Sequence, residues 1–210
     1  MDIDPEPHPG CERAGDGLLV EPVSAVTSLA YVVAAVVIVA LLRRAGRPVP
    51  HAYVVLVAGI GVGSVVQHGP DPAWSDVVHD LPLVGVLCFV AADGVAVLAG
   101  RPRRWWWWVA PTAALMVPVL VRPRAGDLAQ VGVAVVAALL VLERARHEPA
   151  VRLRVAWALG LLAVGGLVGS LSRTGAPLCD PSSLFQGHAV WHVLSAAALV
   201  ALAPLVTTRR

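Results

Sequence analysis

Long apolar stretches, separated by short polar segments, follow one another along almost the whole chain. A run of about twenty apolar residues is long enough to cross the hydrocarbon core of a bilayer as a helix. The pattern predicts seven such spans, at residues 21–42, 51–68, 81–100, 105–121, 128–142, 154–172 and 185–206. We therefore expect an all-α integral membrane protein, a single bundle of seven transmembrane helices at 21–206, with no room for a second domain.

The composition supports this class of protein. Hydrophobic residues make up 57% of the chain and charged residues only 14%, which is typical of membrane proteins. The net charge is +2 and the basic residues are spread over short loops, so we expect no nucleic-acid partner. The first residues lack the basic start and apolar run of a signal peptide, so we expect the first span to direct insertion.

The basic residues are distributed unequally between the two sides of the predicted bundle. Short cytoplasmic loops carry an excess of arginine and lysine. Twelve of the 16 basic residues share one side: Arg43, Arg44, Arg47, Arg101, Arg103, Arg104, Arg144, Arg146, Arg152, Arg154, Arg209 and Arg210. This predicts a cytoplasmic tail at 207–210 and an acidic, extracytoplasmic N-terminal segment at 1–20. We expect a multi-pass protein of a bacterial cell membrane.

Two histidines lie near the start of the last predicted span. His188 and His192 are four residues apart, so on a helix they share one face and can hold one metal ion. Ionisable groups inside membranes are expensive and are functional candidates by default. The predicted topology brings His68, His79 and Asp80 to the same depth, at the facing ends of the second and third spans. The first span begins at this depth too, with Glu21 and then Ser24 and Ser28 on the same face. The alternative is a set of unrelated interfacial histidines, which does not explain why these polar residues gather at one end of the predicted bundle.

Three imidazoles with an open fourth position form a catalytic zinc arrangement. We interpret His68, His188 and His192 as zinc ligands that activate a water for hydrolysis. Asp80 is the candidate base for this water, or the partner that orients a ligand imidazole. Ser64, one turn before His68, either donates to a developing oxyanion or, as serines in spans often do, satisfies a backbone carbonyl.

Haem is the competing cofactor for these histidines, and Asp93 and Cys88 are two further polar or reactive residues inside the predicted spans. Haem is disfavoured because His188 and His192 on one helix face cannot bind the two opposite faces of one iron. Asp93 lies too deep in its span to share the histidine site, and we expect it to form hydrogen bonds inside the bundle. Cys88, inside the same span, is interpreted as a small buried apolar residue.

The other two cysteines indicate how the N-terminal segment is attached to the predicted bundle. Cys11 precedes the first span and Cys179 precedes the seventh, so both are expected on the outer, oxidising side. We predict a disulfide between Cys11 and Cys179, which would tie the N-terminal segment over the mouth of the bundle. The alternative is two unpaired thiols.

Taken in order, these residues resemble the motifs of the alkaline ceramidases. The matching stretches are Cys11-Glu12, Glu21-Pro22 with Ser24, Gly63-Ser64 with His68, His79-Asp80-Leu81-Pro82, and His188-Ala189-Val190-Trp191-His192. The alkaline ceramidases belong to the CREST group of seven-helix membrane hydrolases, which includes the adiponectin receptors. The resemblance implies zinc on the three histidines, with Ser64 and a nearby aspartate at the reacting centre. It also implies hydrolysis of the amide bond of ceramide to a fatty acid and a sphingoid base.

The sequence departs from this family pattern at two places. The family's catalytic aspartate matches His79, so either Asp80 takes over its role or His79 joins the site. The family also has an N-terminal calcium site, and Glu12 and Glu21 match two of its ligand positions. The Asp-Trp pair expected before the cysteine is Pro9-Gly10 here, and Asp16 is the candidate replacement ligand. The alternative for these acidic residues is a solvated flank.

Three functions follow from these observations. The leading hypothesis is a zinc amidase whose substrate is a membrane lipid that enters sideways from the bilayer, without an obligate protein partner. Because many bacteria lack ceramide, the substrate is ceramide or a related N-acyl lipid. The alternatives are a receptor-like or lytic seven-helix protein with a structural zinc site, and a haem-binding electron carrier.

Overall fold

The computed structural model describes residues 10–15, 17–121 and 123–207, without the side chains of residues 123–125. Within these residues the chain forms seven α-helices and a short 3-10 turn at Pro149–Val151. The helices are α1 (Pro22–Arg44), α2 (His51–His68), α3 (Ser75–Leu98), α4 (Trp106–Val121), α5 (Pro123–His147), α6 (Arg152–Leu171) and α7 (Gly187–Leu202). The described part contains one isolated β-bridge, between Gly10 and Arg173, and no strand. The predicted all-α class is confirmed.

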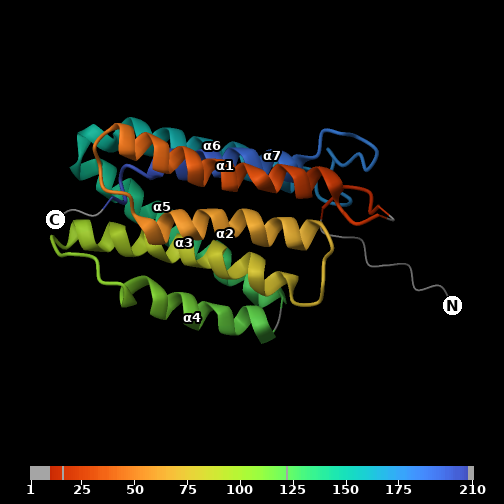
Figure 1. The fold of residues 1–210 in the computed structure, drawn as a ribbon, viewed down its shortest axis with the longest axis horizontal. Coiled ribbons are helices and arrows are strands. Elements are labelled where there is room, and N and C mark those ends of the chain that lie inside the picture. Colours follow the sequence, from red (N-terminus) through yellow and green to blue (C-terminus); the bar gives the residue numbers. More distant parts are fainter. Residues whose placement is uncertain (1–9, 16, 122, 208–210) are drawn as a thin grey trace.

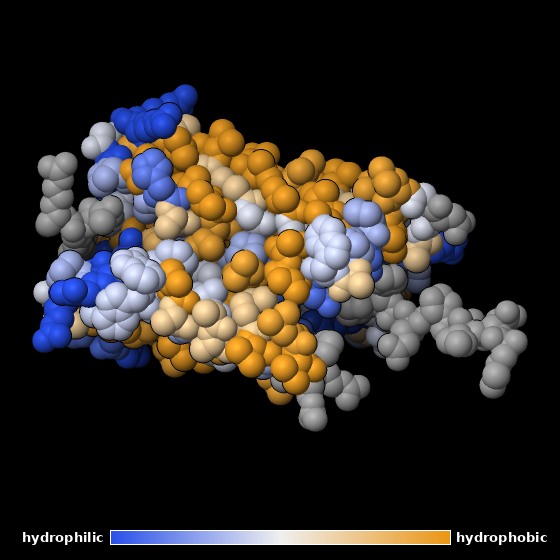
Figure 2. Space-filling view, turned by 60° about the horizontal axis from the view of Figure 1, so that its bottom comes forward, coloured by the Kyte–Doolittle hydropathy of each residue, from blue (hydrophilic) through white to orange (hydrophobic). Residues whose placement is uncertain are grey.

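Five of the described helices are long and apolar enough to cross a membrane, by length and composition. They are Pro22–Arg44, His51–His68, Ser75–Leu98, Gly126–His147 and Pro149–Leu171. The helices α4 and α7 are also apolar but have 16 residues each. On the face drawn in Figure 2, hydrophobic residues cover the middle of the molecule, and hydrophilic residues gather most densely where α1 and α5 finish. These features are consistent with a multi-pass membrane protein.

The helices lie side by side along the long axis of the molecule (Figure 1). The first helix packs between α2 and α7, so the beginning and the end of the chain become neighbours. On the other side of α2, α3 contacts both α4 and α5, and α6 packs mainly against α7. The central core is formed by fully buried side chains that include Ile38, Tyr53, Val57 and Phe89.

A close approach of α2 and α3 positions one end of the bundle. A Cβ atom added to Gly63 would lie 2.7 Å from the Cα atom of His79 and would also meet the carbonyl oxygen of Val78. Pro82 has no N–H group, so it cannot donate to the carbonyl of Val78 as a helical residue normally would. The bare glycine therefore lets α2 pack directly on α3 at the depth of Ser64.

The third helix begins earlier than the apolar pattern predicts. It starts at Ser75, not at residue 81, and Pro82 lies inside it. The polar residues Asp76, His79 and Asp80 interrupt the apolar run, but the helix continues through them. As a result, His79 and Asp80 lie on a helix and not in the loop before it.

Candidate metal centre

The three histidines predicted as ligands come together in the structure. His68 is the last residue of α2, and His188 and His192 lie in the first two turns of α7. One nitrogen from each ring lies within 4.8 Å of the others, and this is the group of possible metal ligands found among the described residues. The Nε2 atoms of His68 and His188 are 3.2 Å apart. His68 and His192 are buried, and His188 is partly buried.

The donor chemistry of this cluster suits a metal ion. Neutral imidazole is a ligand for zinc, copper, iron and nickel. Three protein ligands leave a fourth tetrahedral position open, as in catalytic zinc sites. The three imidazoles therefore form a candidate metal centre whose ligand set fits zinc, although other metals of this series share the same preference.

Hydroxyl groups from α1 and α2 surround His192, which is 2% exposed. The hydroxyl oxygens of Thr27 and Ser28 lie 3.2 Å and 3.4 Å from its Nδ1 atom. The hydroxyl oxygen of Ser64 lies 3.4 Å from its Nε2 atom, and the hydroxyls of Ser28 and Ser64 are hydrogen-bonded at 2.8 Å. Sequence reasoning identified Ser64 and placed Ser28 at the same depth, but it did not anticipate the contribution of Thr27 from the first helix.

His79 and Asp80 form a pair beside this cluster. The Nδ1 atom of His79 is 2.7 Å from a carboxylate oxygen of Asp80, and their side chains are 18% and 14% exposed. Neither residue is in the group of mutually close ligand atoms in the described part of the chain. The Cα atom of His79 lies against Gly63, the residue before Ser64. His79 and Asp80, the two candidates for the role of the family's catalytic aspartate, are therefore hydrogen-bonded to each other.

Glu21 contacts one of the three histidines directly. Its buried carboxylate is hydrogen-bonded to the Nδ1 atom of His68. The sequence assigned Glu21 to a calcium site and missed this contact. Its position at the start of the first span, at the depth of His68, was the available signal.

Glu12 has different partners, at the beginning of α1. Its carboxylate accepts hydrogen bonds from the backbone amides of Val23 (2.5 Å) and Ser24 (2.9 Å) and from the hydroxyl of Ser24 (2.8 Å). A carboxylate at this place satisfies amides that have no partner within the helix and interacts favourably with the helix dipole. Asp16, the third proposed calcium ligand, lies outside the described residues. The calcium site stays a prediction.

The predicted disulfide between Cys11 and Cys179 is present, with an S–S distance of 2.02 Å. The alternative of two unpaired thiols is wrong. The hydroxyl of Thr174 also donates to the carbonyl of Gly10 at 2.8 Å, next to the bridge between Gly10 and Arg173. Gly10 and Cys11 therefore lie against the loop between α6 and α7, and this loop lies at the right-hand end of the bundle in Figure 1.

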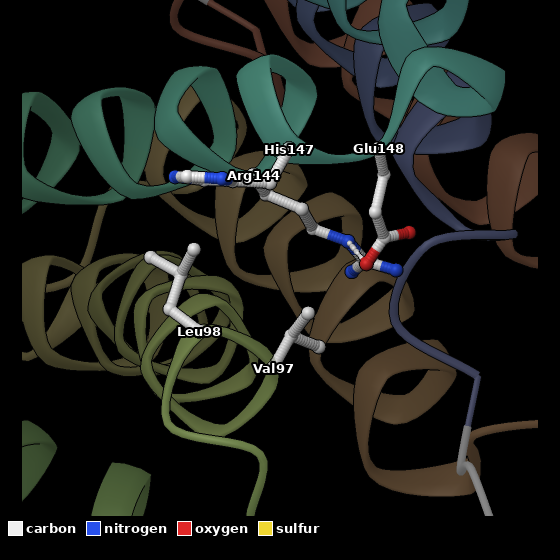
Figure 3. Close-up of a pocket in the computed structure, with 5 residues that line it drawn as sticks. All are labelled: Val97, Leu98, Arg144, His147 and Glu148. Atoms are coloured by element: carbon white, nitrogen blue, oxygen red, sulfur yellow. Dashed lines mark ion pairs between the residues drawn. The ribbon is translucent and has the colours of Figure 1, made fainter.

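A second buried polar cluster lies farther along α3. Asp93 forms ion pairs with Arg103 at 2.5 Å and with Arg144 at 3.1 Å, and Arg144 also donates to the carbonyl of Leu205. The prediction that Asp93 bonds inside the bundle is confirmed, but its arginine partners were not foreseen. The ion pair between Arg144 and Glu148 borders a pocket of about 190 Å³ (Figure 3). The pocket is lined by Val97, Leu98, Arg144, His147 and Glu148.

The fold and this geometry define a class: an all-helical protein with membrane-type helices and a candidate three-histidine metal centre. No protein-family model matches the chain, and no curated protein matches it.

Proposed function

We propose that the protein is a zinc-dependent membrane amidohydrolase that resembles the alkaline ceramidases. Its reaction is hydrolysis of the amide bond of ceramide or a related N-acyl lipid to a fatty acid and an amine. The observation that supports this most is the convergence of His68, His188 and His192, with one nitrogen of each within 4.8 Å of the others. Ser64, beside His192, adds a hydroxyl at the same place.

The three imidazoles would hold the zinc ion. When bound, zinc polarises a carbonyl group and lowers the pKa of a coordinated water towards about 7. Three protein ligands would leave room for a water at the fourth coordination position, unlike the four protein ligands of a closed structural site.

Ser64 is proposed to stabilise negative charge on the oxygen of the amide carbonyl. Its hydroxyl is held by Ser28 at 2.8 Å, in a fully buried position beside His192. A hydroxyl that is already fixed in a water-poor site donates to a developing oxyanion with little reorganisation. Ser28 is therefore proposed to position Ser64 and not to contact the substrate.

His79 and Asp80 are proposed to act together as the proton acceptor. The carboxylate of Asp80 accepts a hydrogen bond from Nδ1–H of His79, which favours the tautomer whose Nε2 atom is unprotonated. The Nε2 atom can then take a proton from the attacking water, and Asp80 stabilises the resulting imidazolium. In this proposal the shift of the aspartate by one position is accommodated by a histidine–aspartate pair.

The membrane topology belongs to the same proposal. We place the N-terminus outside and the C-terminus in the cytoplasm of a bacterial cell, with all seven helices crossing the membrane. The histidine end of the bundle then faces outward, and the arginine-rich end, which includes Arg103 and Arg144, faces the cytoplasm. The lipid substrate enters the site sideways from the bilayer.

The test uses the full-length protein purified in detergent, with its zinc content measured and fatty-acid release from N-acyl lipids followed by mass spectrometry. We expect the wild type to contain zinc and release fatty acid, and His192→Ala to lose both. His51→Ala is the matched control, because His51 is an exposed histidine at the other end of α2. Bound zinc without hydrolysis of any N-acyl lipid would refute the enzyme and favour a receptor-like protein with a structural metal.

A further inference from the structure

We infer that Glu21 is a positioning residue that orients His68 towards the metal centre. The inference rests on the proposed metal site and adds a role for a carboxylate that the sequence associated with calcium. It depends on three features of the described residues: the contact itself, the backbone around it and the segment that covers it.

The two ring nitrogens of His68 face different partners. Nδ1 is hydrogen-bonded to the Oε2 atom of Glu21, and Nε2 is 3.2 Å from the Nε2 atom of His188. A carboxylate on one nitrogen of an imidazole fixes its tautomer and ring orientation and raises the basicity of the other nitrogen. This is the arrangement by which metal-ligating histidines are commonly held. Nε2 of His68 is thereby presented to the cluster.

The backbone fixes the carboxylate relative to the end of α2. The amide of Glu21 donates to the carbonyl of His68 at 2.8 Å, and the amide of Val20 donates to the carbonyl of Gly69 at 2.9 Å. Glu21 also directly precedes α1, where its carbonyl accepts the first helical hydrogen bond, from Ala25. Backbone hydrogen bonds therefore connect the start of α1 to the end of α2, where His68 is the last helical residue.

The backbone at Gly10 covers this contact. A Cβ atom added to Gly10 would lie 2.7 Å from the Oε1 atom of Glu21, so the backbone passes directly over the carboxylate. Gly10 is held there by Thr174 and by the disulfide of the adjacent Cys11. Glu21 is only 4% exposed as a result. Hydrogen bonds are stronger in such a low-dielectric environment than in water.

The contacts of Glu12 support this assignment. Calcium is held by six to eight oxygen ligands, which requires carboxylates that converge on one point. Here the carboxylate of Glu12 bonds to the amides of Val23 and Ser24, and that of Glu21 bonds to His68. Each carboxylate thus accepts hydrogen bonds from a different part of the bundle.

The experiment measures zinc affinity of the full-length protein by competition with a chelator, and the visible spectrum of the cobalt-substituted protein. We expect Glu21→Ala to weaken zinc binding by about 10–100-fold and to change the cobalt spectrum. Glu21→Gln should lose less zinc affinity than Glu21→Ala, because an amide oxygen can still accept the hydrogen bond from Nδ1–H of His68. If Glu21→Ala does not fold, Glu21→Gln takes its place in the test. Glu12→Gln is the matched control and should lower the unfolding temperature while leaving zinc affinity unchanged.

Two results would overturn the inference. One is wild-type zinc affinity and an unaltered cobalt spectrum in Glu21→Ala. The other is calcium binding by the wild type that Glu21→Ala abolishes while zinc affinity is retained. Neither readout depends on turnover. If zinc binding responds as expected but no N-acyl lipid is hydrolysed, the proposed function fails and the role of Glu21 stands. If Glu21→Ala binds zinc normally while His192→Ala loses hydrolysis, only the role of Glu21 fails.

Discussion

Asp93 lies between two arginine side chains, and Asp93→Asn removes its charge while preserving its shape. The three side chains are well buried, with exposed fractions of 10% for Asp93, 13% for Arg103 and 4% for Arg144. Removing one partner of a buried ion pair costs about 3–5 kcal/mol, because the other charge is left without compensation. Arg144 keeps its bonds to Leu205 and Glu148, so we expect a loss near the lower end, about 3 kcal/mol.

The assay is thermal or denaturant unfolding of the detergent-solubilised protein. Glu143→Gln is the control, because Glu143 pairs with Arg146 and His147 on an exposed helix surface and should contribute little to stability. Asp93 lies fourteen residues after His79 on α3, about 21 Å along the axis. Zinc content should therefore be unchanged. The reasoning is refuted if Asp93→Asn is no less stable than Glu143→Gln.

Two further predictions concern the histidine end of the bundle. Replacing Cys11 and Cys179 with serine should lower the free energy of unfolding by about 2–4 kcal/mol. It should also abolish the shift in gel mobility that the wild type shows on reduction. If the wild type migrates equally with and without reductant, this disulfide prediction is wrong. Gly63→Ala should cost about 1–3 kcal/mol by overpacking and reduce fatty-acid release, because the new methyl group displaces the backbone at His79. An unfolding temperature equal to that of the wild type argues against this packing.

The features that depend on local sequence were predictable. An apolar run of sufficient length specifies a helix in a membrane, and the spacing of His188 and His192 fixes their common face. The order of the spans gives each residue a depth, which was enough to bring His68 to the same end and to pair the two cysteines. These parts of the site depend on helix length and alternating direction, and both can be read directly from the sequence.

The lateral contacts were not predictable in the same way. Depth along a helix does not specify rotation about its axis, and rotation decides which neighbour a side chain meets. For this reason Glu21 was expected near His68 without being recognised as its partner. Asp93 was likewise placed inside the bundle without Arg103 or Arg144. Both arginines were predicted to lie in short cytoplasmic loops, whereas Arg144 belongs to the last turn of α5 and both side chains contact Asp93.

The bond between Cys11 and Cys179 joins residues 168 positions apart. Nearly all of the chain must therefore be synthesised before the bond can form. The histidine cluster imposes the same order, since two of its three members arrive with the last helix. During biogenesis, a nascent chain that ends before residue 179 carries neither the disulfide nor a complete ligand set, and one that ends before α7 still lacks two of the three histidines. Formation of the disulfide and metal loading are therefore late events of assembly.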